Sequence, residues 1–584
     1  MVTTVLPGSL TPVSKQLPLS EAISGFVRPG MTLHLAGGIG GPGAAMAEII
    51  RQFHSKAPAF TVILSTVTGH ALSLIHAKLV KKVVCAVCAE ISTTARPAKV
   101  VQRAYAEGSL ELENWSLLSL QQRLMAGAYG VPFMPTRSLL GSSIASDNAD
   151  SFQAIVDPFG SGSTTGIVKA LTPDLSIVHG CVSDAQGNTL LLSPTGEDQW
   201  GPFAAKEGVI AVVEKLVATD YIRAHSSLTK IPGHLVRAVC VAPFGLHPYS
   251  CPNPGIPDFE PYEMDVSFLH ELGSASKSPA ALDAWLDKWI LGNASHEEYL
   301  KSLGKLCLTQ LASRSRRPAL SPSAEVQEAP RTAGPPATTM MLIAAAREIV
   351  RIVRTSGYKT ILAGAGIGAN AAFLAHSMLI AEGYELDLVT GNGQIGYTPV
   401  IGEPILATEV GVRSSKMLTD TVTAQGLLVG GANNRCLSVL GAGQIDKFGN
   451  INSTLGADGQ FLVGSGGAND ALSACESIVL ADQSRDRFVD KLSYVTGVGS
   501  KVSTVVSSLG VMRKDATSRE LRLIGCFSTV EETDLPAKIS AISNNCGWML
   551  AVSPDVVELP QPSLEELKCL SQLSTRTITD NTNQ

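Results

Sequence analysis

Several patterns that mark whole classes of protein are missing from this chain of 584 residues. No uncharged apolar run of 18 residues has membrane character, and no signal-peptide pattern is recognisable. The net charge of −6 is not gathered into a long run of one sign, which argues against an electrostatic nucleic-acid binder. Walker, nucleophile-elbow and H-E-x-x-H motifs are also absent. We therefore expect a cytoplasmic protein that binds neither a metal nor a membrane.

Cysteine pairs with metal-site spacing are scarce as well. Eleven cysteines are scattered, and Cys85 and Cys88 form a lone C-x-x-C within the apolar run "VVCAVCAEI". A zinc site needs a second pair nearby, so we interpret both thiols as reduced core residues. What the chain has instead is 54 glycines, 45% hydrophobic residues and only 5% aromatics. This composition is typical of α/β layers, in which backbones pack closely.

A proline-rich stretch divides the chain into two parts. Residues 314–339 read "RSRRPALSPSAEVQEAPRTAGPPATT", and good helix formers lie on both sides of this stretch. Clustered prolines prevent a continuous helix or a central strand. The sequence therefore predicts a first domain at 1–313, a linker at 314–339 and a second domain at 340–584.

The two parts share short motifs in the same order. "LAGGIGGPGAA" begins at Leu35 and "LAGAGIGANAA" at Leu362, each after an apolar run and before a helical pattern. Later, each part has a D-x-x-G-N turn, at Asp184–Asn188 and at Asp446–Asn450. Strand-like runs that alternate with helical patterns indicate βαβ units. We predict two tandem α/β domains with mainly parallel sheets flanked by helices.

The glycine-rich loops allow three interpretations. Gly38, Gly40 and Gly43 fit G-x-G-x-x-G, but the second strand, "FTVILSTVTGH", lacks the acid of a dinucleotide site. The glycines could instead serve only close packing between strand and helix. In the third interpretation, backbone N–H groups of the loops at 37–43 and 464–468 hold the carbonyl oxygen of an acyl thioester.

Longer segments carry a family resemblance. The first part resembles the A subunit, and the second the B subunit, of glutaconate-type class I CoA-transferases. The first part does so in "GSLELENWSLLSLQQRLMAGAYGVPFMPTRSLLGSSIA" (108–145), "DPFGSG" (157–162), "DLSIVHGCVSDAQGN" (174–188) and "PFGLHPYSCP…YEMD" (243–265), and the second in "GAGQIDKFGNINST" (441–454), "GSGGAND" (464–470) and "VSSLGVM" (506–512). The resemblance implies two subunits fused in one chain, with ring-opening CoA hydrolases as close relatives.

The same resemblance implies a reaction and exposes a departure from it. Transferases of this family attack the acyl-CoA with a glutamate in a Glu-Asn-Gly-like turn of the second part, and then pass CoA to a carboxylic acid. That turn corresponds to residues 391–393, so Gly391 stands at the glutamate position and offers no nucleophile. The nearest acids in sequence are Glu385, Asp387 and Glu403.

Two chemistries consequently stay open for an acyl-CoA enzyme. CoA transfer is the family norm but needs a substitute carboxylate, whereas hydrolysis needs a general base and an oxyanion site. A non-catalytic CoA-binding protein is the alternative from another class. The resemblance suggests Glu90, Glu111 or Glu113 as the acid and Asn392 as an orienting residue. The expected CoA contacts are Gly37, Gly38, Gly40, Gly391, Gly393, Gly466 and Gly467. We expect no bound cofactor, a CoA thioester as substrate, possible use of an acceptor carboxylate, and by analogy a homodimer.

Overall fold

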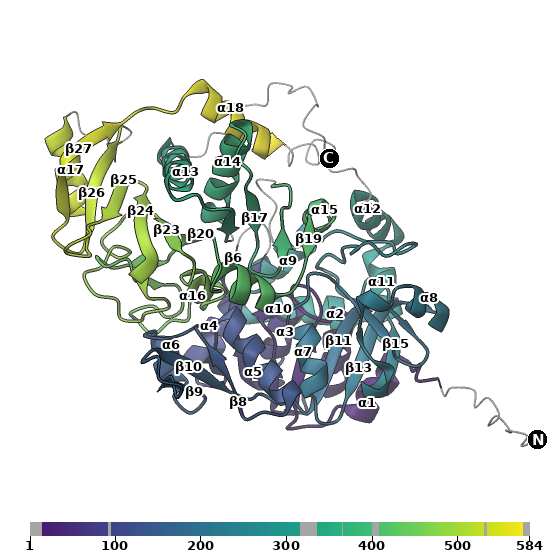
Figure 1. The fold of residues 1–584 in the computed structure, drawn as a ribbon. Coiled ribbons are helices and arrows are strands. Elements are labelled where there is room, and N and C mark those ends of the chain that lie inside the picture. Colours follow the sequence, from purple (N-terminus) through teal and green to yellow (C-terminus); the bar gives the residue numbers. More distant parts are fainter. Residues whose placement is uncertain are drawn as a thin grey trace, which may run out of the picture.

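The computed structural model describes residues 14–91, 95–315, 336–364, 366–399, 408–528, 530 and 534–575. Figure 1 shows the N-terminal half (purple to teal, residues 14–315) packed against the C-terminal half (green to yellow, residues 336–575). Each half contains one large sheet with parallel central strands and flanking helices, which confirms the predicted tandem α/β fold. No helix in the described ranges is long and apolar enough to cross a membrane.

The predicted linker at 314–339 falls mostly on residues 316–335, outside the described ranges. Helix α12 (Lys305–Ser315) continues through the first two residues of that predicted segment. Helix α13 (Pro336–Ser356) begins within its last four residues, and Pro336 stands at the first helical position. A proline fits there because its missing N–H has no acceptor in a first helical turn.

The N-terminal sheet has nine strands, and those at its centre run parallel. In spatial order they are β14 (Thr229–Ile231), β12 (Thr189–Leu191), β11 (Leu175–Asp184), β1 (Thr32–Ala36), β2 (Phe60–Ile63), β4 (Val80–Cys85) and β7 (Glu111–Asn114), with β13 (Val209–Val217) beside β11 and β15 (Val236–Val241) beside β13. All ten residues of β11 are buried, as expected of a strand covered on both faces.

The C-terminal sheet has ten strands. In spatial order they are β19 (Met417–Leu418), β18 (Gln394–Ile395), β17 (Asp387–Val389), β16 (Thr360–Ala363), β20 (Cys436–Gly441), β23 (Glu476–Ala481), β24 (Val502–Ser507), β25 (Gly510–Lys514), β26 (Leu521–Phe527) and β27 (Ala551–Leu559). Strand β16 pairs in parallel with β17 and β20, as β1 pairs with β2 and β11. The repeated motifs therefore occupy equivalent strands.

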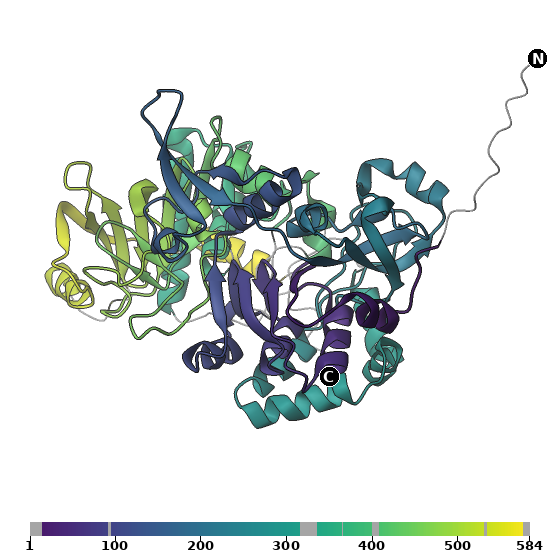
Figure 2. The ribbon, with the colours of Figure 1, turned by 90° about the horizontal axis from the view of Figure 1, so that it is seen from below.

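Helices cover the faces of both sheets. The N-terminal half has α1 (Leu19–Phe26), α2 (Gly43–Phe53), α3 (His70–His76), α4 (Lys99–Ala106), α5 (Leu117–Tyr129), α7 (Glu197–Ala204), α9 (Val266–Ala275), α10 (Pro279–Leu286) and α11 (His296–Leu303). The C-terminal half has α14 (Ile367–Ala381), α15 (Glu409–Ser414), α16 (Ala468–Ala471), α17 (Leu535–Asn544) and α18 (Leu564–Thr575). Figure 2 shows the teal helices of residues 266–315 along one side of the purple strands.

Two helices show how the sequence positions the surface between the halves. Helix α5 begins with a capping box in which Ser116 and Ser119 satisfy each other's backbone N–H groups, and it ends at Gly130 in the left-handed conformation. The π-helical segment η4 (Val422–Val429) packs against α5, with Gly426 facing Leu118. The segment starts after Asp420, whose carboxylate accepts the N–H of Thr423 at 2.9 Å.

Backbone hydrogen bonds join the two halves at a second place. The N–H of Cys88 donates to the carbonyl of Val463 at 2.9 Å, and the N–H of Leu117 donates to that of Gly466 at 2.9 Å. Asp470 adds a buried side-chain contact by accepting from the N–H of Leu118 at 3.0 Å. The halves consequently share main-chain and side-chain contacts at the carboxyl ends of the strands in their sheets.

Candidate functional site

The turn of residues 390–393 lies at the carboxyl end of β17 and connects it to β18. The Thr390 hydroxyl accepts the N–H of Gln394 at 2.9 Å and donates to the Asn392 side-chain oxygen. Thr390 and Gln394 are buried, whereas Asn392 is partly exposed. Asn392 is thus held by its own turn, at an edge where α/β enzymes place functional groups.

Gly391 faces a side chain from the neighbouring segment η4. A Cβ at position 391 would lie 2.3 Å from Nε2 of Gln425, and a Cβ at Gly467 would lie 2.8 Å from the same atom. Gln425 is 2% exposed, and its carboxamide fills the space beside both glycines. The structure thereby brings together two predicted CoA contacts, Gly391 and Gly467, around a residue that the sequence did not indicate.

A short path of main-chain bonds connects this turn to the N-terminal half. The N–H of Thr419 donates to the carbonyl of Gly393 at 2.9 Å, and the N–H of Thr195 donates to the carbonyl of Thr419 at 3.1 Å. A Cβ at Gly196 would lie 3.7 Å from the Thr421 hydroxyl. Residues 390–393 therefore lie beside the contact between the halves, as a site between them requires.

The N-terminal half presents a carboxylate at this contact. Glu197, the first residue of α7, accepts from the N–H of Ser65 at 2.9 Å and from its hydroxyl at 2.5 Å. The Gln121 amide donates to the same carboxylate at 3.1 Å. A carboxylate has about four acceptor positions, so these three donors leave one position of the partly exposed Glu197 for a water.

The three acids suggested by the resemblance lie in other pockets. Glu113, on β7, accepts from Trp115 at 2.8 Å and forms ion pairs with Lys82 at 2.8 Å and with Arg123. Burial favours its neutral form, but the charges of Arg123 and Lys82 outweigh burial and lower the pKa of Glu113. Glu111 pairs with Lys82 at 2.7 Å and is mostly exposed. Both line a pocket that does not include the turn at 391.

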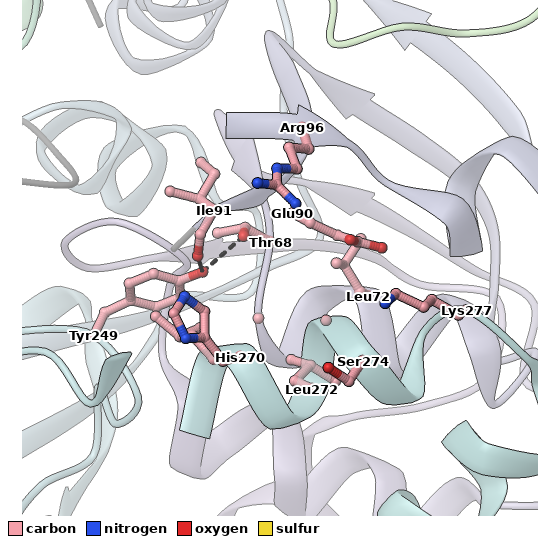
Figure 3. A pocket seen from close by; sticks show the side chains of 13 residues that line it. Thr68, Leu72, Glu90, Ile91, Arg96, Tyr249, His270, Leu272, Ser274 and Lys277 are labelled. Atoms are coloured by element: carbon pink, nitrogen blue, oxygen red, sulfur yellow. Dashed lines mark hydrogen bonds between the residues drawn. The ribbon is translucent and has the colours of Figure 1, made fainter. Parts of the chain in front are cut away.

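Glu90 lies in a separate pocket, which Figure 3 shows from close by. Burial raises its pKa, partly offset by the N–H and the charge of Lys99. Arg96 and Lys277 flank Glu90, while the Tyr249 hydroxyl is hydrogen-bonded to Thr68 at 2.7 Å on the far wall. This pocket of ≈ 160 Å³ is lined by residues of the N-terminal half, and Gln425 is not among them.

The first glycine-rich loop packs against buried side chains. Gly37 has a φ of +131°, and a Cβ there would lie 2.7 Å from the Cβ of His179. A Cβ at Gly40 would lie 2.4 Å from the Tyr249 ring, and one at Gly38 would contact Leu246 at 3.5 Å. Close packing accordingly requires glycine at positions 37 and 40, whatever the loop binds.

The second glycine-rich loop contacts the other half with its donors. The N–H of Ser465 donates to the Asn114 side chain at 3.2 Å, and the N–H of Gly466 to the carbonyl of Ala86 at 3.0 Å. These two N–H groups therefore bind the N-terminal half, and the expectation that the loop at 464–468 holds a thioester carbonyl stays a prediction for its other N–H groups.

One buried cluster near the first loop has the residue types of a metal site. Ligand atoms of His179, Glu214 and Cys251 lie within 4.8 Å of one another. Four groups already donate to or pair with the Glu214 carboxylate, namely His179 at 2.8 Å, the N–H groups of Phe244 at 2.6 Å and Gly245 at 3.2 Å, and the Tyr262 hydroxyl at 3.0 Å. These contacts leave the carboxylate no acceptor position for a metal ion. The cluster instead holds the backbone of Phe244 and Gly245 through Glu214, next to His179, which packs against Gly37.

The sequence did not point to Glu197 or Gln425. Glu197 follows the first D-x-x-G-N turn and opens a helix, but no spacing rule indicates that it faces Ser65. Gln425 lies in an apolar segment, "VTAQGLLV", that carries no recognised motif.

Comparisons with known proteins show which proteins the chain is similar to. Residues 17–242 match the family model described as "Coenzyme A transferase". An uncharacterized protein of Archaeoglobus fulgidus is 30% identical over 292 residues, which are 50% of this chain and 62% of that protein. The A subunit of glutaconate CoA-transferase from Acidaminococcus fermentans is 26% identical over 51% of this chain and 95% of its own length. The B subunit of 3-oxoadipate CoA-transferase from Pseudomonas knackmussii is 29% identical over 41% of this chain and 93% of its own length.

Two further matches concern the fold and a second activity. A crystal structure described as an acyl-CoA transferase of Escherichia coli O157:H7 in a thioester complex with CoA covers 95% of this chain and 97% of its own. At 15% identity and a TM-score of 0.64 it shows the fold alone. A cholesterol ring-cleaving hydrolase IpdA subunit of Rhodococcus jostii is 25% identical over 51% of this chain and 98% of its own length.

Fold and matches together define an α/β enzyme built from two CoA-transferase-like halves. Residues 17–242 match the coenzyme A transferase family, and the two halves of the chain are similar to the A and B subunits of CoA-transferases.

Proposed function

We propose that this enzyme hydrolyses a CoA ester at the contact between its two halves. Water attacks a carbonyl carbon of the acyl-CoA, with Glu197 as the general base. The observation that carries the proposal is the pairing of a glycine at position 391, whose side-chain space holds the Gln425 amide, with a carboxylate at position 197 that keeps one acceptor position.

The chemistry needs only groups that the chain supplies. Glu197 removes a proton as the water oxygen bonds to the carbonyl carbon, and the carbonyl electron pair moves to its oxygen. When the tetrahedral intermediate collapses, the C–S bond breaks and the proton goes to the CoA thiolate. In a β-dicarbonyl CoA ester, attack at the distal carbonyl would break a C–C bond instead, as the name of the Rhodococcus jostii relative suggests for that protein.

CoA transfer is the second candidate, because both halves are similar to transferase subunits. Transfer would require a covalent glutamyl-CoA thioester, and Glu197 is one carboxylate at this contact that could form it. The hydrolytic role is favoured because the Gln425 amide, which cannot form a thioester with CoA, occupies the side-chain space beside Gly391. Glu90, Glu111 and Glu113 stay predictions for the same role.

An assay with and without an acceptor separates the two reactions. The purified chain is incubated with saturated, dicarboxylic and 3-oxoacyl-CoA esters, alone or with acetate or succinate, and products are followed by mass spectrometry. We expect an acid product without any acceptor, together with free CoA when the thioester is cut. New acyl-CoA that forms only with an acceptor would contradict hydrolysis and support transfer.

A further inference from the structure

We infer that Gln425 is the residue that holds the substrate carbonyl, in the place where transferases of this family carry their nucleophile. This inference rests on the proposed hydrolysis of a CoA ester. It starts from the distance of 2.3 Å between Nε2 of Gln425 and the position of a Cβ on residue 391. A carboxamide from η4 thus takes up the space into which a side chain of residue 391 would extend.

The Gln425 carboxamide has a buried oxygen without a hydrogen-bond partner. Its Oε1 is inaccessible to solvent and unbonded, and the residue as a whole is 2% exposed. A buried polar group without a partner destabilises the folded state, because it loses its hydrogen bonds to water. We therefore assign the hydrogen-bonding capacity of this amide to a ligand group.

A cavity lies on one side of the Gln425 side chain, and two glycines lie on another. A Cβ at Gly391 would lie 2.3 Å from Nε2 and one at Gly467 would lie 2.8 Å from it, so a larger side chain at either position would displace the amide. An open cavity of ≈ 230 Å³ reaches Gln425 between α5 and η4, with Leu118 and Pro135 on the N-terminal side and Gly426 on the C-terminal side. This cavity can take the acyl part of a CoA ester of modest size.

The amide and the base come from opposite halves. Gln425 lies one helical turn after Thr421, whose hydroxyl lies 3.7 Å from the position of a Cβ on Gly196, next to Glu197. Nε2 donates to the carbonyl oxygen as it becomes negative, while Glu197 takes the proton of the attacking water. Because an amide cannot form an anhydride with the acyl group, the choice of water over a carboxylate nucleophile follows from Gln425.

Gln425→Leu tests the inference, with Gln483→Leu as a buried control. Losing an oxyanion donor typically lowers kcat about 100-fold, and removal of an unpartnered amide should leave the melting temperature unchanged or raised. Gln483 is also a buried glutamine, but both ends of its carboxamide are hydrogen-bonded. It donates to the carbonyl of Ile542 at 2.9 Å and accepts from the Ser507 hydroxyl at 2.7 Å. Its replacement should lower the melting temperature and leave kcat unchanged. A kcat of Gln425→Leu within twofold of wild type would overturn the inference.

A binding experiment separates this inference from the proposed function. Acetonyl-CoA carries a carbonyl and S-propyl-CoA lacks it, and hydrolysis removes neither group. We expect Gln425→Leu to weaken acetonyl-CoA binding about tenfold and to leave S-propyl-CoA binding unchanged, measured by calorimetry. Equal effects on both ligands, or none, would overturn the role of Gln425. If the wild type hydrolyses no acyl-CoA but shows the tenfold difference, only the proposed function fails.

Discussion

Both halves contain the same D-x-x-G-N turn, but they differ in the residues at the contact between them. In the N-terminal half, Asp184 accepts from the N–H groups of Gln186 and Asn188 at 3.0 Å and from the Asn188 amide at 2.8 Å. In the C-terminal half, Asp446 accepts from Phe448 at 2.9 Å, from the N–H of Asn450 at 3.0 Å and from its amide at 2.8 Å.

The same halves differ where chemistry is expected. The N-terminal half presents the Glu197 carboxylate with three donors, whereas the C-terminal half has Gly391 beside an unbonded Gln425 amide. The repeated turn satisfies the same backbone groups in both halves and therefore serves the fold. The difference between Glu197 and Gly391 agrees with the proposal that the reacting group lies on the N-terminal half.

Glu197→Gln should give the largest effect, because it removes the proposed base from the half that carries it. We expect kcat for acyl-CoA hydrolysis to fall about 10³-fold, within the usual range for loss of general-base catalysis. Steady-state kinetics measure the change. Glu207→Gln is a suitable control, since Glu207 pairs with Arg28 at an exposed site. Equal losses for both variants would place the base elsewhere.

Replacing the repeated aspartates tests the similarity between the halves. Asp184→Ala and Asp446→Ala should each lower the free energy of unfolding by about 1–2 kcal/mol, because each leaves several partly buried donors unpaired. The N-terminal variant should lose slightly more, since Asp184 also accepts from the Thr219 hydroxyl at 3.0 Å. Denaturant unfolding of both variants checks this. A clearly larger loss of unfolding free energy for Asp446→Ala than for Asp184→Ala would contradict the similarity of the two turns.

Gly391→Ala should be destabilising by about 1–3 kcal/mol, because its methyl group would overlap Nε2 of Gln425. Combining it with Gln425→Ser, which shortens the opposing side chain, should restore most of that stability. The thermal unfolding of the single and double variants measures the coupling. Additive effects would mean that the two residues do not compete for the same space.

Glu409 should give the smallest effect, a pH dependence of about 1–3 kcal/mol. It accepts from the N–H of Asn253 at 2.7 Å across the contact between the halves, and burial raises its pKa to about 7. The folded protein consequently keeps a proton that the unfolded chain loses between about pH 4 and 7. The contribution of Glu409 to the free energy of unfolding is at its maximum below about pH 4 and falls as the pH rises to about 7. Above that pH the contribution no longer changes.

Glu409→Gln removes that titration. Thermal unfolding at pH 5, 6 and 7.5 should show a smaller decline in melting temperature for the variant than for the wild type. An unchanged slope would mean that the Glu409 carboxyl titrates at its usual pH in the folded protein.

Periodicity and short motifs predicted the tandem α/β fold because each half repeats its strand-turn-helix signals around β1 and β16. The same reasoning identified the turn at 391, whose glycines and apolar strand are local features. It could not find Glu197 or Gln425, since their roles depend on contacts with Ser65 and Gly391 that lie far apart in sequence. The homodimer, the domain limits and the roles of Glu90, Glu111, Glu113 and Asn392 stay predictions, and Glu403 lies outside the described residues.

The central claim, that no glutamate of this chain becomes covalently attached to CoA or to the acyl group, is tested most directly by one turnover in H₂¹⁸O. Excess enzyme is mixed with an acyl-CoA that it hydrolyses, and both the acid product and the protein's peptides are analysed by mass spectrometry. The account predicts one ¹⁸O atom in the released acid and none in any protein carboxylate. A CoA adduct on a glutamate, or ¹⁸O in the Glu197 peptide, would contradict it.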